Sequence, residues 1–391
     1  MKRTAFLVFL VLTAILAGSM AVSDRGSSST PALVAQTRDA LRKRQWDRAE
    51  ALLLRLSNRQ LPLADRAALE AELEFGRGRP EEAVRRLASI PEADPAASRA
   101  RMVAGQVLRR LHQARRAEAH LRDAIRLDPG LLEARKELVL ILAAQGRRSE
   151  VAEQFQAIAQ LRPLAWEEAL LWTATLEDIW INDTIRTELE RFVAADPDDR
   201  FSRLALAAVN LREGDLERAE HWLDPIAASD PESVVLRARI ALERGDLEAL
   251  QQLIREGPDE NAEVCLLRGQ LAARLGDPEA AMGHFREALR IDPTRRDALQ
   301  GLSLALRQLG RSQEAAVYQE QAERWRMLTQ RLQQAQGAGG KRDSVLLREI
   351  GETCESLARL PEAVSWYRLA IAADPLDAKA QAALKRLEPA S

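Results

Sequence analysis

The chain has 391 residues and carries 57 Lys and Arg against 59 Asp and Glu, which gives a formal net charge of −2. Because the two signs are interspersed and nearly cancel, the composition gives no reason to expect nucleic acid as a partner. Aromatic residues make up only 4% of the chain, and its two cysteines, Cys265 and Cys354, are too few for a disulfide framework or a structural zinc site.

Residues 1–21 have the parts of a secretory signal. A basic pair follows the initial Met, an apolar run covers residues 5–17, and small residues lead up to Ala21. This order predicts export with cleavage after Ala21. Alternatively, the apolar stretch over residues 5–22 is retained as a membrane anchor, since it is almost long enough to span the hydrocarbon core. The first interpretation predicts a periplasmic or secreted protein, and the second a membrane-anchored one with the rest of the chain outside the cytoplasm. The Ser-rich residues 22–32 predict a flexible tether.

Beyond this tether the sequence repeats itself. Prolines recur at steps of 34 residues, and so do two columns of apolar residues: Pro95, Pro129, Pro163, Pro197 and Pro231; Ala49, Ala83, Ala117, Val151, Ile185 and Ala219; and Leu53, Leu87, Leu121, Phe155, Leu189 and Leu223. Three independent columns with one period indicate a repeat architecture.

Each unit has the features of two helices joined by a tight turn. Apolar residues recur at the helical period, as in Leu138, Ile141 and Leu142. A glycine such as Gly276 ends the first helix, and an Asp-Pro pair ends the second, because Pro cannot continue a helix. The chain is therefore predicted to be all-α, with helices of about 13 residues that gain stability by stacking on their neighbours.

The segment over residues 266–293 resembles a tetratricopeptide repeat. The small, aromatic and helix-breaking positions of that motif are occupied by Gly269, Gly276, Ala281, Phe285, Ala288 and Pro293. The segments around Gly105 and Gly351 are similar to it as well. The resemblance implies a right-handed superhelical solenoid of antiparallel helix pairs with about nine to ten repeats. We expect a repeat array over residues 33–330, a linker over 331–343, and a C-terminal repeat with a capping helix over 344–391.

Two places depart from the repeat pattern. The turn glycines Gly214, Gly245 and Gly276 are only 31 residues apart, so the repeat over residues 232–257 is clipped at both ends and is a candidate for a kink. In addition, the helix over residues 313–336 is predicted to be longer than an ordinary second helix, because no breaker interrupts it before Gly337.

No catalytic constellation is recognisable in the sequence. The four histidines, His112, His120, His221 and His284, fall in different repeats, and no metal-binding histidine motif or nucleophile turn is present. We therefore predict a protein that is not an enzyme and has no catalytic residue, bound metal or cofactor. Cys265 and Cys354 each fall in the first helix of a repeat, where we expect them to be buried and unpaired.

The resemblance also implies that side chains of the first helices line a concave groove that takes up a partner protein or peptide. By register, the groove residues are Arg99, Met102, Gln106, Arg109, Lys136, Leu140, Leu170, Glu177, Phe201 and Leu204. Part of the family holds a C-terminal carboxylate with Lys and Asn at fixed groove positions. Gln106, Leu140 and Ala174 stand at those positions here, so the resemblance does not extend to that clamp.

Three tryptophans are concentrated in the repeat that follows Pro163. Trp172 falls on a packing position and is expected in the core, whereas Trp166 and Trp180 lie at helix edges and are candidate aromatic anchors for a partner. An export signal followed by repeats without a catalytic constellation indicates a scaffold or adaptor of the cell envelope. The alternative is an accessory subunit of an envelope enzyme or assembly complex, docked through the long helix over residues 313–336.

Overall fold

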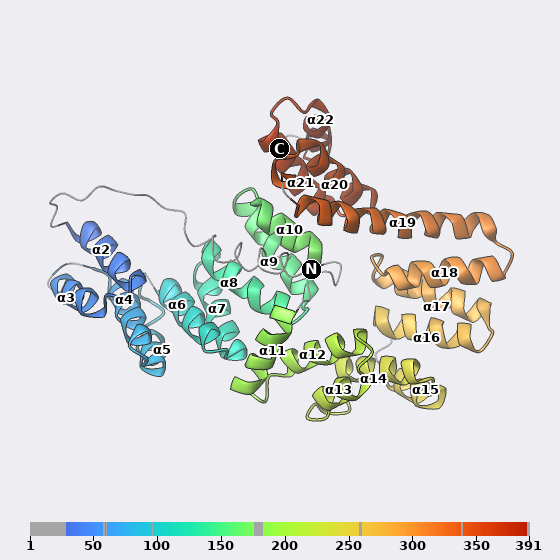
Figure 1. The fold of residues 1–391 in the computed structure, drawn as a ribbon, viewed down its shortest axis with the longest axis horizontal. Coiled ribbons are helices and arrows are strands. Elements are labelled where there is room, and N and C mark those ends of the chain that lie inside the picture. Colours follow the sequence, from blue (N-terminus) through green and yellow to red (C-terminus); the bar gives the residue numbers. More distant parts are fainter. Residues whose placement is uncertain are drawn as a thin grey trace. The chain divides into compact units, whose positions relative to one another are not determined.

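The computed structural model describes residues 29–57, 59, 61–95, 97–175, 183–257, 260–337 and 339–388. The predicted signal or anchor, Glu177 and Trp180 lie outside these ranges. Within them the chain forms α-helices, one short 3-10 helix and no strand, so the all-α prediction is confirmed (Figure 1). In this described part, no helix combines the length and apolar character needed to cross a membrane.

The chain divides into two compact units, each a stack of helix pairs. Unit 1 comprises residues up to 154 together with 182–199, and unit 2 comprises residues 155–181 together with 200 onward. Helix α9 (Arg148–Leu161) crosses the first boundary. Residues 155–175 thus group with the C-terminal half of the chain, and the bounds of the array predicted over residues 33–330 stay a prediction.

Unit 1 contains α2 (Thr30–Arg42), α3 (Trp46–Ser57), α4 (Leu63–Gly76), α5 (Pro80–Ala88), α6 (Ala97–Arg110), α7 (Ala114–Leu127), α8 (Leu132–Ala144) and α11 (Asp183–Ala195). Successive helices pair as hairpins, as in α6 with α7, and the first helices of neighbouring pairs also contact one another, α2 with α4, α4 with α6 and α6 with α8. The first helices therefore form one continuous layer of this unit.

Unit 2 contains α10 (Trp166–Thr175), α12 (Arg200–Arg212), α13 (Leu216–Leu223), α14 (Pro231–Arg244), α15 (Leu247–Glu256), α16 (Ala262–Arg274), α17 (Pro278–Ile291), α18 (Arg296–Gln308), α19 (Ser312–Ala335), the 3-10 helix η2 (Gly340–Arg342), α20 (Ser344–Ser356), α21 (Leu360–Ala373) and α22 (Ala378–Leu387). The clipped repeat at 232–257 still forms a hairpin, α14 with α15, although α15 has only 10 residues.

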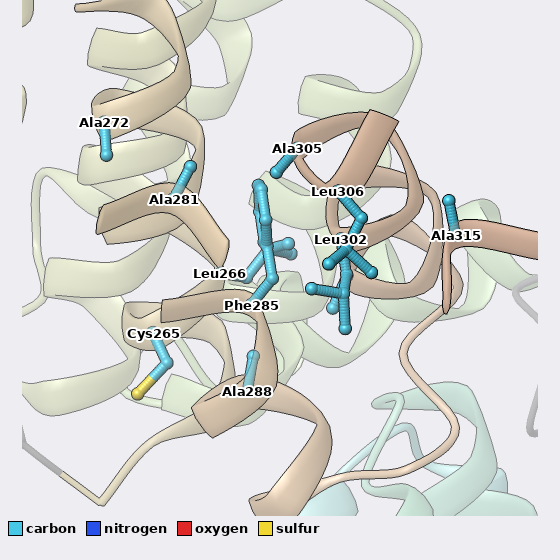
Figure 2. Close-up of a cluster of buried hydrophobic side chains, with 11 residues drawn as sticks. Cys265, Leu266, Ala272, Ala281, Phe285, Ala288, Leu302, Ala305, Leu306 and Ala315 are labelled. Carbon is cyan, nitrogen blue, oxygen red and sulfur yellow. The ribbon is translucent and has the colours of Figure 1, made fainter. Parts of the chain in front are cut away.

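The repeats are close-packed where small and aromatic residues alternate. Phe285 of α17 packs between Gly269 of α16 and Gly301 of α18: an added Cβ would lie 2.6 Å from its ring at Gly269 and 2.5 Å at Gly301. Figure 2 shows its side chain directed toward Leu302 and Ala305 of α18. Because no larger residue fits at either glycine without displacing the ring, the motif positions hold three consecutive helices at a fixed separation.

The turns of the hairpins need a left-handed backbone. Gly276 has φ +77° between α16 and α17, and the side chain of Asp277 caps α17 by accepting a hydrogen bond from the backbone N–H of Ala280 at 2.9 Å. In two other repeats, His112 and Ala358 occupy this turn with φ +59° and +58°. The turn geometry is therefore retained even where glycine is not.

Helix α19 continues to Ala335, so the predicted linker over residues 331–343 begins as helix. Trp325, Leu328 and Leu332 of α19 are buried, and α19 contacts α20. The Arg331 guanidinium donates hydrogen bonds to Glu349 O at 3.2 Å and to the hydroxyl of Thr353. This segment is thus packed within unit 2, and the prediction differs because a Gly-rich stretch alone does not reveal what the preceding helix contacts.

Helix α10 packs against α21 and α19, far along the chain (Figure 1). The indole N–H of Trp366 donates a buried hydrogen bond of 2.9 Å to the Thr173 hydroxyl, which in turn donates to Ala169 O at 2.8 Å. Trp172 is 1% exposed and stacks on Phe155 with 5.8 Å between ring centroids, which confirms its predicted place in the core. No pattern in the sequence indicates this long-range contact.

Candidate functional site

The two units divide the residues predicted to line the groove. Unit 1 holds the residues from α6 and α8, and unit 2 holds those from α10 and α12: Arg99, Met102, Gln106, Arg109, Lys136 and Leu140 in the former, and Leu170, Phe201 and Leu204 in the latter. Each unit therefore has to be considered separately as a binding surface.

Three of the unit 1 residues hold neighbouring first helices together. Arg99 of α6 forms an ion pair with Asp65 of α4 at 3.1 Å. Arg109 and Gln106 both donate to the carboxylate of Glu137 on α8, at 2.7 Å and 3.1 Å. Since the Glu137 side chain is almost fully buried, the charge of Arg109 and the two hydrogen bonds compensate its carboxylate for lost hydration. Arg99 and Arg109 are thus bonded within unit 1, and reversing their charge would disturb the stack itself.

The apolar residues predicted to line the groove differ in how exposed their side chains are. Met102 is half-buried and packs against the core of α4–α6, while Leu140 and Leu170 are half-buried. Leu204 is only 8% exposed and lies in a core cluster with Ala207. Phe201 packs against the same cluster. Leu204 was expected on the open surface and is instead a core residue, because α12 contributes two adjacent faces to packing.

The groove positions of Gln106 and Leu140 have equivalents in earlier repeats that the prediction omitted. Arg38, Glu72, Gln106 and Leu140 stand at successive steps of 34 residues, one on each of α2, α4, α6 and α8. We call the side of these helices that carries this column the first-helix face. The signal was available in the sequence, because the same 34-residue step that selected Gln106 also selects Arg38 and Glu72.

Glu72 on the first-helix face feels the charges of arginines on α2 and α6. Burial raises the pKa of the Glu72 carboxyl, while the positive charges of Arg110, Arg38 and Arg42 act in the opposite direction. The Arg110 guanidinium also lies over the ring of Phe75, 5.5 Å from its centroid.

The candidate aromatic anchor Trp166 is already engaged within unit 2. The ammonium group of Lys341 lies 5.7 Å from the centroid of its ring and 2.5 Å from a carboxylate oxygen of Glu167. Trp166 is half-buried. Its ring therefore already contacts Lys341 of η2.

The other titratable side chains that the structure describes do not form a recognisable metal or catalytic site. In the described ranges no three His, Cys, Asp or Glu side chains are arranged to hold a metal ion. Cys265 and Cys354 are both buried, as predicted, and burial raises the pKa of the Cys354 thiol. Burial also lowers the pKa of His120 and of His284.

One open hollow of about 560 Å³ lies against α20, α21 and α22 and is lined by Glu355, Tyr367, Lys379 and Arg386 among others. Its polar groups satisfy one another: the Tyr367 hydroxyl donates to Glu355 at 2.8 Å, and Arg386 pairs with the same carboxylate at 2.5 Å. This bonding joins the last helix to the C-terminal hairpin, which is a structural role.

Two family models of the tetratricopeptide repeat match the chain, one at residues 262–295 and one at residues 69–131. The first covers α16 and α17, and the second extends from α4 through α7. No curated protein matches the sequence.

Several solved structures are similar to this chain. The APC/C hetero-tetramer Cut9–Hcn1 has a chain that is 13% identical, with a TM-score of 0.34, and the match covers 97% of this chain and 98% of that one. A tetratricopeptide repeat protein from Parabacteroides merdae is 14% identical, with a TM-score of 0.33, over 62% and 99% of the two chains. PilW, a type IV pilus biogenesis factor, is 18% identical, with a TM-score of 0.30, over 54% and 98%.

The helix pairs, the small-residue contacts around Phe285 and the two family-model matches agree with one another. Stacked repeats of this kind expose extended surfaces that mediate protein–protein contacts, and the fold is typically a non-catalytic scaffold. The chain therefore contains tetratricopeptide repeats, at residues 69–131 and at residues 262–295.

Proposed function

We propose that this protein is a scaffold of the cell envelope that holds a partner protein or peptide on the first-helix face of unit 1. The scaffold role is supported by the tetratricopeptide repeats. The envelope location is supported by the basic, apolar and small-residue segments of residues 1–21. The observation that carries the choice of face is the continuous contact of α2, α4, α6 and α8, which places one column of side chains along a single surface.

Cell fractionation with N-terminal sequencing tests the envelope location. We expect the protein outside the cytoplasm, with a mature terminus at Val22 if the signal is cleaved, or in the membrane fraction with residues 5–22 intact if they are an anchor. Recovery of the full-length chain from the cytoplasmic fraction alone would rule out both.

Site-specific photo-crosslinking tests the face. A photoreactive amino acid at Leu140, on the first helix α8, is expected to form adducts with a partner in intact cells. The matched control is Leu54 on the second helix α3 of the same unit, which is 66% exposed and stands outside the proposed face. Equal adducts at both positions would show that the first-helix face is not the binding surface.

A second candidate function is an accessory subunit docked through α19. It is favoured by the exposed apolar side chains Val317 and Met327 on that helix. Deleting residues 313–391 is a poor test, because it would also remove α21, which packs against α10 and donates a hydrogen bond from Trp366 to Thr173. The sharper test replaces Val317 and Met327 with Ser, with Leu376→Ser in the exposed loop before α22 as the control. Loss of a high-mass complex with Leu140 adducts retained would support the subunit role.

A further inference from the structure

We infer that the exposed side of α3 in unit 1 binds a membrane surface that carries anionic phospholipids. This inference rests on the proposed location in the cell envelope and concerns how the folded repeats meet the membrane. The surface consists of the turn before α3, the exposed side of α3 and the residue just beyond its end, and it carries Arg44, Arg48, Leu54, Arg55 and Arg59. We call it the arginine face.

Helix α3 has one side packed into unit 1 and the opposite side open to solvent. Its packed side holds the buried residues Ala49, Leu52, Leu53 and Leu56. At 100° per residue, the opposite side holds four residues within an arc of about 120°, all of them exposed: Arg48, Ala51, Leu54 and Arg55. The two arginines are one and two turns from Leu54 or nearer, so basic and apolar side chains share one open surface.

The arginines of this face have no carboxylate partner in the part of the chain that the structure describes. Arg48 donates a hydrogen bond to the side chain of Gln45 at 3.2 Å, and no ion pair is formed by Arg44, Arg55 or Arg59. The acidic residues of α3 are engaged on its other edge, where Asp47 and Glu50 pair with Arg77 of α4 at 3.6 Å and 2.6 Å. The positive charge of the arginine face is therefore available to an external anion.

The charge of this hairpin differs in sign from that of the whole chain. Residues 42–59 contain six basic and two acidic side chains, a net charge of +4, whereas the whole chain carries −2, so the remainder carries −6. An anionic surface attracts the arginine face and repels the remainder, which orients the molecule. Guanidinium groups suit lipid phosphates because their N–H groups donate in pairs to phosphate oxygens.

Leu54 favours a membrane over a nucleic acid or an acidic peptide. Its side chain is 66% exposed among the arginines. A helix that lies on a membrane places basic side chains at the phospholipid head groups and apolar side chains at the boundary of the acyl chains. A phosphate backbone or a row of carboxylates offers no such apolar layer, so only a membrane uses both parts of this surface.

The chain that precedes α2 leads to the arginine face. Residues 22–28 can span at most about 25 Å. Because α2 and α3 pair as a hairpin, the end of α3 that carries Arg55 returns beside the beginning of α2, where this segment enters. If residues 5–22 are retained as an anchor, the arginine face is held close to the membrane at a high effective concentration. If the signal is cleaved, the face attaches the protein reversibly.

Vesicle co-sedimentation tests the inference with the chain that begins at Val22. This chain keeps every residue that the structure describes and lacks the apolar segment, so binding reports on the folded part. The probes are vesicles of phosphatidylglycerol and phosphatidylcholine in equal parts, and vesicles of phosphatidylcholine alone. We expect saturable binding to the first, none to the second, and weaker binding at high salt, which screens the charges.

The site variant is Arg44→Gln/Arg48→Gln/Arg55→Gln, and it is expected to bind the phosphatidylglycerol vesicles at least about tenfold more weakly. The matched control is Arg255→Gln/Arg307→Gln/Arg342→Gln, which removes the same charge from exposed arginines of α15, α18 and η2. The control is expected to bind as the wild type does. Circular dichroism spectra that match the wild type establish that each variant is folded.

A second pair of variants tests the apolar contact. Leu54→Ser is expected to bind the phosphatidylglycerol vesicles about threefold more weakly, because it removes the side chain that enters the acyl boundary. Leu376→Ser removes an equally large side chain that is 88% exposed in the loop before α22, and no change is expected there.

Three results would overturn the inference. The first is equal weakening by the two arginine variants, and the second is equal binding to both kinds of vesicle. The third is arginine-dependent binding of single-stranded DNA or of a poly-Glu peptide in preference to the vesicles. If vesicle binding fails while fractionation still finds the protein outside the cytoplasm, only the membrane contact is wrong. If the vesicles bind but the protein is recovered from the cytoplasm alone, the envelope location is wrong while the affinity of the arginine face for anionic lipid stands.

Discussion

At the residue scale, the contact of Phe285 with two glycines shows how one added methyl group can change the stability of the fold. In Gly301→Ala the new Cβ meets the Phe285 ring, and overpacking of this kind costs about 1–3 kcal/mol. In Gly283→Ala, on the exposed side of α17, no atom lies within 4 Å of the added Cβ, so helix propensity alone acts and stabilises by roughly 1 kcal/mol. Urea denaturation should therefore shift in opposite directions for these two variants.

At the turn formed by Ala358, the reverse replacement, of Ala by Gly, is expected to be stabilising. Its φ of +58° is a left-handed conformation that costs an L-residue about 1–2 kcal/mol, whereas Gly adopts it freely. Ala358→Gly is expected to raise the stability of unit 2 by roughly 0.5–1 kcal/mol. Hydrogen exchange of α20 and α21 measures the effect, and slower exchange is expected. Faster exchange in these helices would contradict the argument.

Glu72 gives a prediction about pH. Its pKa is raised in the folded chain relative to the unfolded chain, so the folded state favours the protonated carboxyl. The associated stability is present below the unfolded-state pKa and is lost as pH rises through the folded-state pKa. Glu72→Gln should therefore be more stable than the wild type at neutral pH and no more stable at acidic pH. Glu190→Gln, on the exposed surface of α11, is the control in the same urea titrations.

At the scale of elements, the contact of α10 with α21 is the feature that joins distant parts of unit 2. Thr173→Val keeps the shape of the side chain and removes the acceptor for the Trp366 indole N–H. Leaving that buried donor unpaired is expected to cost about 1–3 kcal/mol. The readout is faster hydrogen exchange in α10 and α21.

Thr187→Val on α11 is the matched control for this contact. The Thr187 hydroxyl also donates to the carbonyl four residues earlier, Asp183 O, at 2.9 Å, but it is exposed. No measurable change in exchange is expected there. If both variants behave alike, the bond from Trp366 does not stabilise the docking of α10.

The helices themselves were largely predictable, since each depends on signals within one repeat. The clipped repeat at 232–257 forms its hairpin because Gly245 still adopts a left-handed turn with φ +76°. The end of α19 was less predictable. Glycines after Ala335 marked where the helix stops, yet the burial of Leu328 and Leu332 against other elements depends on α20, which follows in the sequence without a recognisable contact signal.

At the scale of the whole molecule, exposed ion pairs dominate the surface. Hydrogen bonds from Arg77, Arg126 and Arg290 lower the pKa values of Glu50, Glu92 and Glu287, respectively. Carboxyls with lowered pKa contribute stability above their unfolded-state pKa and lose it as pH falls through the folded-state value. Stability should therefore decline at acidic pH, and the decline should be smaller in high salt, which screens exposed pairs. Thermal unfolding at two salt concentrations measures this difference.

The candidate site was predictable only in part, for a reason that appears at the same scale. Register placed Gln106 and Arg109 on the first-helix face, but register does not show that both are bonded to Glu137. Which charges remain unbalanced depends on the side chains of the neighbouring repeats. For that reason Arg109 was predicted as a binding residue although it is bonded to Glu137 within unit 1.

The sequence by itself determined the helix pairs and their stacking, because the 34-residue step, the turn residues and the small-residue contacts act within a repeat or between adjacent ones. Only the tertiary structure decided the division into two units and the bond from Trp366 to Thr173, which spans 193 residues. Small rotations between successive repeats add up along a solenoid, and no local pattern records their sum. Contacts between distant repeats follow from that sum.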